Sequence, residues 1–335
     1  MKPTSCLIVG AGMAGLLAAR QLQAQGVRVT VLDKGRGVGG RMATRRVRPA
    51  VEGEGAALAV FDHGAQFFTV RDERFAALVD DWQEAGVVAQ WSRGFATADG
   101  SYYADGHPRY RGVGGMTAIA KHLAHGLDVR LATRAVSLQA TADGWQAITS
   151  DGQRFEGASL ILTPPVPQAL ALLDEGGVAL PETVRRSLEA ISYEPCLALL
   201  VLLPDGGQVP EPGGLWPVGE PLAWVADNHR KQVSPRRGAI TLHAGPEFSQ
   251  AHWDSDKETV AGAMLAAAAE WLGADPLEVQ LQRWRYSKPV RLHGAPCLAA
   301  VEPAAVVFAG DAFAGPRVEG AALSGLAAAD WLLAD

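Results

Sequence analysis

Three glycines near the start of the chain have the spacing that main-chain binding of a pyrophosphate requires. They are Gly10, Gly12 and Gly15, in the pattern G-x-G-x-x-G. The first glycine permits a tight turn, the second lets the backbone approach the phosphates, and the third lets a helix pack close to a strand. A helix that begins here directs the positive end of its dipole at the negative charge. The pattern therefore predicts a site for a dinucleotide.

The segments on either side of the glycines have the context that this motif needs. An apolar run at residues 7–9 predicts a strand before them, and residues 13–19 predict a helix after them. A β-branched run at residues 26–32 predicts a second strand that ends at Asp33, about 20 residues past the glycines. A carboxylate at that point accepts hydrogen bonds from ribose hydroxyls. The alternative is that Asp33 is only a turn residue.

The composition is that of a globular protein with a sizeable core. Of 335 residues, 48% are hydrophobic, and the mean hydropathy is +0.05. The formal charge is −6 without blocks of like charge, so we expect no nucleic acid partner. Cys6, Cys196 and Cys297 lack the spacing of a zinc site or a disulfide framework, so we expect no metal and a reducing cytoplasm. Residues 5–19 are interrupted by glycines and too short to span a bilayer, so we expect no membrane partner.

A glycine-rich loop follows Asp33 and carries two arginines, Arg36 and Arg41. Guanidinium groups match phosphates bidentately, so the loop suits a second anionic contact, although a flexible solvent loop with incidental arginines is the alternative. The order of an acid, then Gly-Gly-Arg, then Thr44 resembles the signature of FAD-dependent oxidoreductases of the amine-oxidase superfamily. The resemblance implies FAD rather than NAD as the cofactor. Asp33 then stands where the superfamily usually has Glu.

A second motif lies near the other end of the sequence. The buried run at residues 305–309 leads into Gly310 and Asp311, and a segment rich in small residues follows. A strand that ends in Gly-Asp brings a carboxylate to the ribityl hydroxyls of a flavin, and the next helix N-terminus can stabilise negative charge on a reduced flavin. The alternative is a C-terminal helix without a ligand.

The middle of the chain narrows the resemblance. The motifs at residues 61–68, 227–228, 241–243 and 283–286, together with both ends, look like those of bacterial renalases over nearly the whole chain. Renalase-like enzymes oxidise the 2- and 6-dihydro isomers of NAD(P)H, transfer a hydride to N5 of FAD, and pass the electrons to oxygen, which gives hydrogen peroxide and NAD(P)+. By resemblance, Trp284 is an aromatic wall of the substrate site, and Asn228 and His243 orient the substrate. No general base is implied, and each of these three residues could instead belong to the core.

The resemblance also implies a set of FAD contacts, which are Gly10, Ala11, Gly12, Met13, Ala14, Gly15, Asp33, Lys34, Arg36, Gly40, Arg41, Met42, His63, Ala65, Gln66, Val136, Thr163, Gly310, Asp311, Arg317, Val318, Gly320 and Ala321. In this set Val136 is the adenine contact. Cys297 does not lie in the motif that covalent flavin attachment needs, so we expect non-covalent FAD.

The predicted fold class is α/β, with a Rossmann-type FAD-binding domain and a second, mainly antiparallel-sheet substrate domain, as in amine oxidases and p-hydroxybenzoate hydroxylase. We expect the FAD-binding domain at residues 1–74, 105–165 and 290–335, and the substrate domain at residues 75–104 and 166–289. The patterns predict helices and strands at the following positions: helices at residues 75–84 and 257–271; strands at 129–138, 144–150, 154–155, 159–163, 196–203, 222–226, 239–243 and 279–286.

Three functions remain open from the sequence. The first is a dihydronicotinamide oxidase, the second a flavin amine oxidase, and the third a non-catalytic FAD-binding protein. They differ in which compound, if any, reduces the flavin. The isomer preference, the choice between NAD and NADP, the electron acceptor and the oligomeric state are left open.

Overall fold

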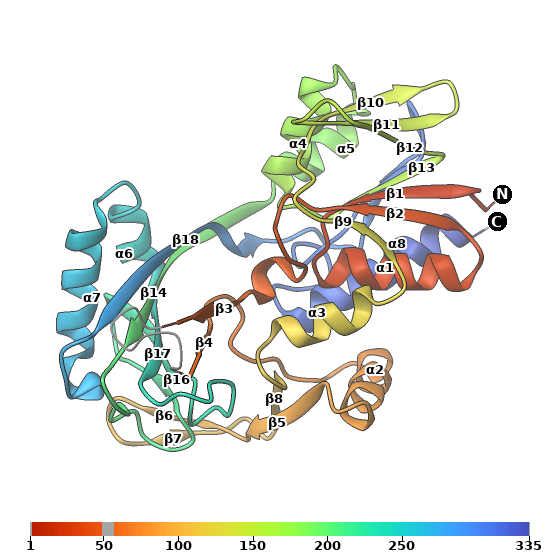
Figure 1. Ribbon diagram of the computed structural model, residues 1–335. Helices are drawn as coiled ribbons and strands as arrows, with labels where there is room; N and C mark the ends of the chain where they lie inside the picture. Colours follow the sequence, from red (N-terminus) through yellow and green to blue (C-terminus); the bar gives the residue numbers. More distant parts are fainter. Residues whose placement is uncertain (1, 49–56, 335) are drawn as a thin grey trace. The chain divides into compact units, whose positions relative to one another are not determined.

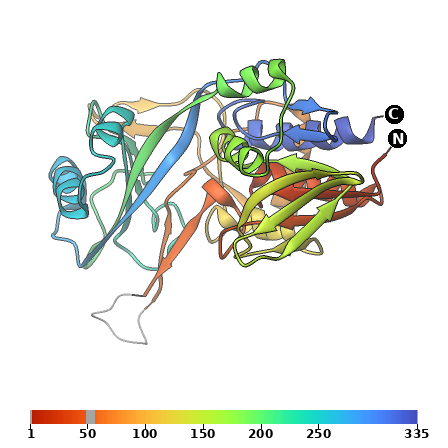
Figure 2. The same ribbon diagram turned by 90° about the horizontal axis from the view of Figure 1, so that it is seen from above.

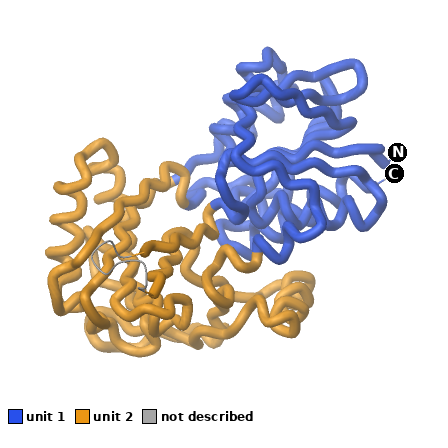
Figure 3. Tube along the Cα trace, in the orientation of Figure 1, with its two compact units in different colours: residues 1–40, 120–193, 288–335 blue, residues 41–119, 194–287 orange. Residues whose placement is uncertain are grey.

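The computed structural model describes residues 2–48 and 57–334, and its contacts divide the chain into two compact units. The first unit comprises residues 1–40, 120–193 and 288–335, and the second comprises residues 41–119 and 194–287 (Figure 3). Each unit is built around a sheet of its own. The predicted α/β class, with a Rossmann-type domain and a mainly antiparallel second sheet, is confirmed.

The first unit is organised around a six-stranded sheet. In spatial order its strands are β19 (Leu298–Ala300), β20 (Val306–Phe308), β13 (Ser159–Leu162), β1 (Ser5–Val9), β2 (Arg28–Leu32) and β9 (Asp128–Arg130). All neighbours are parallel except β19 and β20. The central strands are almost entirely apolar and buried, as expected for parallel strands that are covered on both faces.

Two helices from opposite ends of the sequence pack together on this sheet. They are α1 (Met13–Ala24) and α8 (Val318–Leu333), which lie side by side in Figure 1. A Cβ on Gly325 of α8 would overlap the backbone of Ala14 in α1. The two helix backbones can therefore approach this closely only because position 325 is glycine.

A three-stranded meander and two helices complete the first unit (Figures 1 and 2). They are β10 (Ala135–Thr141), β11 (Gly144–Thr149), β12 (Arg154–Gly157), α4 (Val166–Glu175) and α5 (Glu182–Glu189). The prediction of one strand over residues 129–138 is wrong. The structure has β9 and β10 there, because β9 pairs with β2 whereas β10 pairs with β11, and the chain turns between them at Ala132, whose φ is 51°.

The second unit is organised around a seven-stranded sheet. In spatial order its strands are β18 (Glu278–Arg291), β14 (Ser192–Leu202), β17 (Ala239–Ala244), β16 (Leu222–Asp227), β15 (Gly214–Trp216), β6 (Phe95–Thr97) and β7 (Tyr102–Tyr103). Helix α7 (Lys257–Leu272) packs on β16 and β17, confirming the predicted long helix. It begins after Asp256, which accepts from the Thr259 amide, and ends at Gly273 with a φ of 69°.

Smaller elements of the second unit carry several of the predicted site residues. They are the short helix η1 (Gly40–Met42), the pair β3 (Thr44–Val47) and β4 (Ala59–Asp62), helix α2 (Glu73–Glu84), the pair β5 (Val88–Ser92) and β8 (Arg109–Gly112), and α6 (Pro246–Ala251). Helix α3 (Thr117–Ala124) begins in the second unit and continues into the first. Strand β4 packs beside β17. By their contacts, residues 41–74 and 105–119 belong to the second unit, and residues 166–193 belong to the first. This grouping differs from the bounds expected for the FAD-binding and substrate domains. Those functional bounds stay a prediction.

Within the described part of the chain, no helix is long and apolar enough to cross a membrane.

Candidate functional site

The turn between β1 and α1 is built from glycines that the protein's own packing requires. Gly10 has a φ of +105°, and its amide donates to the Leu32 carbonyl at 2.8 Å. The hydroxyl of Thr163, directly after β13, donates to the carbonyls of Val9 at 2.9 Å and Gly10 at 3.2 Å. A Cβ on Gly10 would overlap this hydroxyl, and a Cβ on Gly15 would overlap the Gly10 carbonyl. Thr163, Gly10 and Gly15 therefore fix the close approach of strand and helix.

Gly12 differs from these two glycines because the protein itself does not need it. It precedes α1 with an extended backbone that other residues adopt easily, and a Cβ there would have no atom of the described residues within 4 Å. The open space lies at the N-terminus of a helix, where main-chain amides point outward. Ala11, Met13 and Ala14 are buried around the turn. The cradle thus fits a pyrophosphate, since a side chain at position 12 would fill the space that the phosphates need.

Asp33 holds the two loops of the cradle together. Its carboxylate accepts from the amide of Ala11 at 2.7 Å and from the amide of Gly35 at 2.6 Å. Each carboxylate oxygen has a second lone pair, so these bonds leave acceptor capacity for a ribose hydroxyl.

The other cofactor residues predicted in the first unit lie at exposed or irregular positions. Lys34 and Arg36 are exposed, and a Cβ on Gly40 would lie 3.7 Å from the Cα of Gly12. Val136 lies in a β-bulge between Ala135 and Ser137 in the pairing of β10 with β11. Its side chain is 37% exposed, so it is accessible to a ligand.

The second predicted motif forms the entry of α8. Gly310 follows β20 with a φ of +141°, and its amide donates to the Ser324 hydroxyl at 2.8 Å. Asp311 is half-buried, and exposed Arg317 directly precedes the helix without capping it through its side chain. Val318, Gly320 and Ala321 lie in the first turn of the helix. A Cβ on Gly320 would overlap the Gly315 carbonyl, so the turn is as tightly built as that before α1.

Four predicted residues of the second unit come together from distant parts of the sequence. We call His63, Gln66, His243 and Trp284 the His63 cluster. The indole Nε1 of Trp284 donates to the His63 carbonyl at 2.8 Å, and the two rings stack with centroids 5.3 Å apart. His243 Nε2 lies 3.4 Å from Gln66 Nε2. Strands β17 and β18 thus bring one predicted residue each to the segment after β4.

The segment that carries His63 is pressed against residues 41–43. The Ala65 amide donates to the Arg41 carbonyl at 2.8 Å, and a Cβ on Gly64 would overlap the same carbonyl. The Arg41 guanidinium donates to the carbonyls of Tyr286 and Ser287, both at 3.3 Å, which links it to β18. Met42, the next residue in the sequence, is buried. Arg41 therefore organises the second unit, in addition to the cofactor contact predicted for it.

Two buried polar atoms of the His63 cluster have no hydrogen-bond partner among the residues that the structure describes. They are His63 Nδ1 and Gln66 Oε1. Buried polar groups are almost always paired, so both atoms have hydrogen-bonding capacity that a ligand with complementary groups can use. Burial lowers the pKa of His63 and of His243 to about 4, so both imidazoles are neutral at pH 7. The cluster is therefore aromatic, polar and uncharged.

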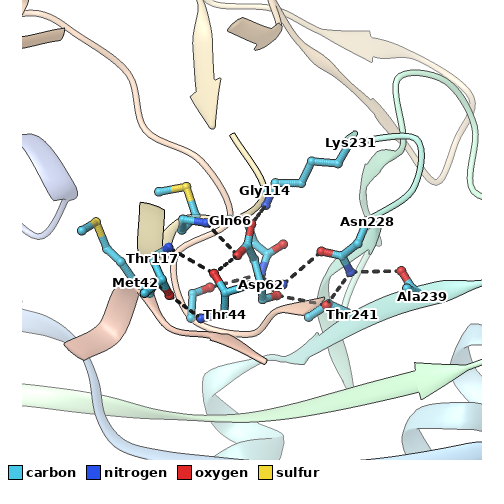
Figure 4. A network of polar contacts seen from close by, with 12 residues as sticks. Met42, Thr44, Asp62, Gln66, Gly114, Thr117, Asn228, Lys231, Ala239 and Thr241 are labelled. Carbon is cyan, nitrogen blue, oxygen red and sulfur yellow. Dashed lines mark hydrogen bonds and ion pairs between the residues drawn. The ribbon is translucent and has the colours of Figure 1, made fainter. Parts of the chain in front are cut away.

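Asn228 is connected to this cluster through Asp62 and is fully buried. Its Oδ1 accepts from the Asp62 amide at 3.1 Å, and its Nδ2 donates to the Ala239 carbonyl at 3.0 Å and to the Thr241 hydroxyl at 2.9 Å (Figure 4). Every donor of its amide is used inside the protein. We therefore treat Asn228 as a positioning residue, and its predicted contact with substrate stays a prediction.

Sequence reasoning missed the centre of this network, which is a buried ion pair of Asp62 and Lys231. Asp62 ends an apolar strand, a position at which an acidic residue could have drawn attention. Lys231 lies in a polar turn after β16 and carries no such signal. Among the described residues, no group of three or more His, Cys, Asp or Glu side chains is placed to hold a metal ion.

Comparisons with known proteins agree with this arrangement. Residues 8–82 match the NAD(P)-binding Rossmann-like domain, and residues 82–333 match the flavin containing amine oxidoreductase family. A curated relative, lysine-specific histone demethylase 1 homolog 1 of Arabidopsis thaliana, is 48% identical over 48 residues. That match spans only 14% of this chain and 6% of the relative.

Solved structures resemble the chain over almost its entire length. Wild-type putrescine oxidase bound to putrescine has a TM-score of 0.71 at 16% identity, covering 99% of both chains. A CLA-producing fatty acid isomerase from P. acnes has a TM-score of 0.68 at 12% identity, covering 98% of this chain and 97% of the other. Similarity at these identities shows the fold alone.

Proposed function

Since the chain belongs to the family of flavin-containing amine oxidoreductases, we propose that it oxidises the 2- and 6-dihydro isomers of NAD(P)H. Its cofactor is FAD, as the sequence predicts. We propose that the cradle residues and the entry of α8 hold the dinucleotide, and that His63, Ala65 and Gln66 contact the flavin. When bound, the flavin accepts a hydride and passes the electrons to oxygen, giving hydrogen peroxide.

The neutral charge of the His63 cluster is the observation that carries this proposal. A substrate amine is protonated at pH 7 and needs a carboxylate or a cage of aromatic rings to hold it. Asp62 lies next to the cluster, but its carboxylate is bound to Lys231. Burial is the main cause of the low pKa of both histidines; Lys231 lowers the pKa of His243 further, whereas at His63 the charge of Asp62 raises the pKa and that of Arg45 lowers it. This environment favours an uncharged ring over an ammonium group.

The residues of the cluster supply orientation and no proton transfer. Trp284 offers a flat face, and the neutral imidazole of His243 offers a polar contact to a carboxamide. Loss of a hydride from C2 or C6 restores the aromaticity of the nicotinamide ring, so the reaction needs alignment with the flavin and no strong base. The low pKa values of the two histidines agree with a role that does not depend on their charge.

A flavin amine oxidase is the second candidate, because the family and the likeness to putrescine oxidase favour it. The fold does not decide between the two, since an isomerase of fatty acids shares it. A non-catalytic FAD-binding protein is the third.

Anaerobic mixing distinguishes these functions. We expect 6-dihydroNAD or 2-dihydroNADP to bleach the flavin absorption rapidly, and ordinary 4-dihydroNADH or putrescine to bleach it slowly. Fast bleaching by putrescine, with none by the isomers, would instead favour the amine oxidase. Bleaching by none of these compounds would favour the binding protein.

We also propose that FAD is held non-covalently and that the protein works in a reducing cytoplasm. All three cysteines are free, and burial raises the pKa of Cys297, which makes it a poor nucleophile toward the flavin. Intact-mass spectrometry after denaturation tests the first point, because a covalent flavin would remain as added mass.

A further inference from the structure

The ion pair of Asp62 and Lys231 is completely buried in the second unit. Both side chains are 0% exposed, and Lys231 Nζ lies 2.7 Å from Asp62 Oδ2. The ammonium group also lies 5.0 Å from the centre of the Trp91 ring. Removing two charges from water is costly, so a buried pair indicates a need for one defined arrangement more than a gain in stability.

Asp62 uses its remaining polar atoms as well (Figure 4). Its Oδ1 accepts from the Thr44 hydroxyl at 2.6 Å and from the Met116 amide at 2.9 Å. Its carbonyl accepts from the Thr241 hydroxyl at 3.0 Å and from Gln66 Nε2 at 2.6 Å. Asp62 thus connects Lys231 to the His63 cluster through a single residue.

These contacts decide which way the amide of Gln66 faces. Its Nε2 donates to the carbonyls of Asp62 at 2.6 Å and Gly64 at 3.2 Å. The reverse orientation would set the amide oxygen against two carbonyl oxygens, which repel it. Gln66 Oε1 is therefore held away from both carbonyls, and it is one of the two buried atoms of the cluster without a partner.

We propose that the Asp62–Lys231 pair is a positioning element for ligand binding. It holds Gln66 so that Oε1 accepts a hydrogen bond from an N–H group of a planar heterocyclic ligand. Two ligands carry this chemistry: the flavin ring has one imide N–H, and a nicotinamide has the N–H groups of its carboxamide. The flavin case needs only the cofactor, whereas the nicotinamide case rests on the proposed function.

A double-mutant cycle separates this role from a merely structural one. The variants are Lys231→Met, Gln66→Met and the two combined, in the full chain. Arg109→Met is the matched control, because Arg109 is 2% exposed and paired with Asp105 in the same unit, and its guanidinium donates to Arg93, Asp105 and His107 rather than to the segment 62–66. The readouts are Tm, the dissociation constant of FAD, and KM for 6-dihydroNAD.

We expect Gln66→Met to weaken either FAD or 6-dihydroNAD by about 3- to 10-fold, the effect of one lost hydrogen bond. Lys231→Met should weaken the same ligand by a similar factor when Gln66 is present, and by much less in the Gln66→Met background. Arg109→Met should lower Tm and leave both constants near those of the parent. A change in the FAD constant identifies the flavin as the partner of Gln66, and a change in KM alone identifies the nicotinamide.

The proposal is overturned if Lys231→Met weakens binding equally in both backgrounds, or if it lowers Tm without changing either constant. It is also overturned if Gln66→Met changes neither constant. If Lys231→Met does not fold, Lys231→Gln takes its place in the cycle, because it removes the charge of the ion pair and keeps a polar group that can donate to Asp62. Since titration with FAD uses no substrate, its outcome is independent of whether the dihydronicotinamide proposal holds.

Discussion

Trp284 and His63 are joined twice, by a hydrogen bond from the indole to the His63 carbonyl at 2.8 Å and by stacking of their rings at 5.3 Å. The stacking covers one side of the imidazole, and the hydrogen bond fixes the angle between strand β18 and the segment after β4. Trp284 therefore shapes the His63 cluster even before a ligand binds.

We expect Trp284→Ala to slow reduction of the flavin by a dihydronicotinamide. The lost aromatic packing is worth about 1–3 kcal/mol, which corresponds to roughly 5- to 150-fold in rate if it is felt in the transition state. Anaerobic stopped-flow absorbance measures this step. Reoxidation by oxygen serves as the control and should change less. Trp284→Phe keeps a ring for stacking and should lie between the parent and Ala, and equal rates for all three proteins would place the substrate elsewhere.

Gly12→Val should abolish FAD binding without destabilising the apoprotein, whereas Gly15→Ala should destabilise the apoprotein itself. Gly12→Val adds a side chain where the described protein atoms leave open space, so the apoprotein should keep its Tm while FAD is lost. Gly15→Ala places a methyl group against the Gly10 carbonyl, so it should lower Tm even without FAD. Thermal unfolding of both apoproteins, followed by titration with FAD, checks this. A Gly12→Val protein that binds FAD fully would contradict the cradle assignment.

Asp33→Ala should weaken both the fold of the cradle and its affinity for FAD. It leaves the amides of Ala11 and Gly35 without their carboxylate acceptor, and a charge-assisted hydrogen bond of this kind contributes about 1.5–3 kcal/mol. Asp33→Asn keeps an oxygen acceptor and should be affected less. Urea unfolding of the apoprotein and titration with FAD separate the two effects. If the apoprotein is unaffected, Asp33 does not hold the loops as described.

The two histidines of the cluster should make stability fall in mild acid. The pKa of His63 drops from 6.5 to about 4 on folding because of burial. The unfolded chain therefore binds more protons between these two values, so the free energy of unfolding decreases as pH falls through this window and levels off below it. The loss assigned to His63 is at most on the order of 3 kcal/mol.

Urea unfolding between pH 7 and pH 4 measures this dependence. His63→Phe keeps a ring against Trp284 and removes the titrating group, so the stability difference between parent and variant should shrink as pH falls. A difference that stays constant with pH would mean that His63 does not titrate as described.

The cradle could be predicted from the sequence because its signal is local. Gly10 and Gly15 each meet a separate packing demand and Gly12 leaves open space between them, all within six residues, and the strands on either side are short apolar runs. Helix α4 could also have been found, since Val166, Ala169, Leu170 and Leu173 are buried at helical spacing and a proline lies in its first turn.

The network around Asp62 could not be predicted in the same way. Its ion pair joins positions 169 residues apart, and they meet because β4 packs against β17, which pairs with β16. The sequence motif pointed to Asn228 as a substrate contact, but a motif does not tell whether a polar side chain faces a ligand or the interior. Likewise, nothing local shows that residues 129–138 divide between two sheets.

The order of strands in the first unit has a consequence for synthesis on the ribosome. Strand β13 separates β1 from β20, and helix α8 packs on α1, so neighbouring parts of the first unit are synthesised far apart in time. At about 5–20 residues per second, synthesis of helix α8 is completed on the order of 20–60 s after that of the cradle. Until then the apolar face of α1 lacks the helix that buries it. The nascent chain therefore exposes the cradle and α1 throughout synthesis of the residues that separate α1 from α8.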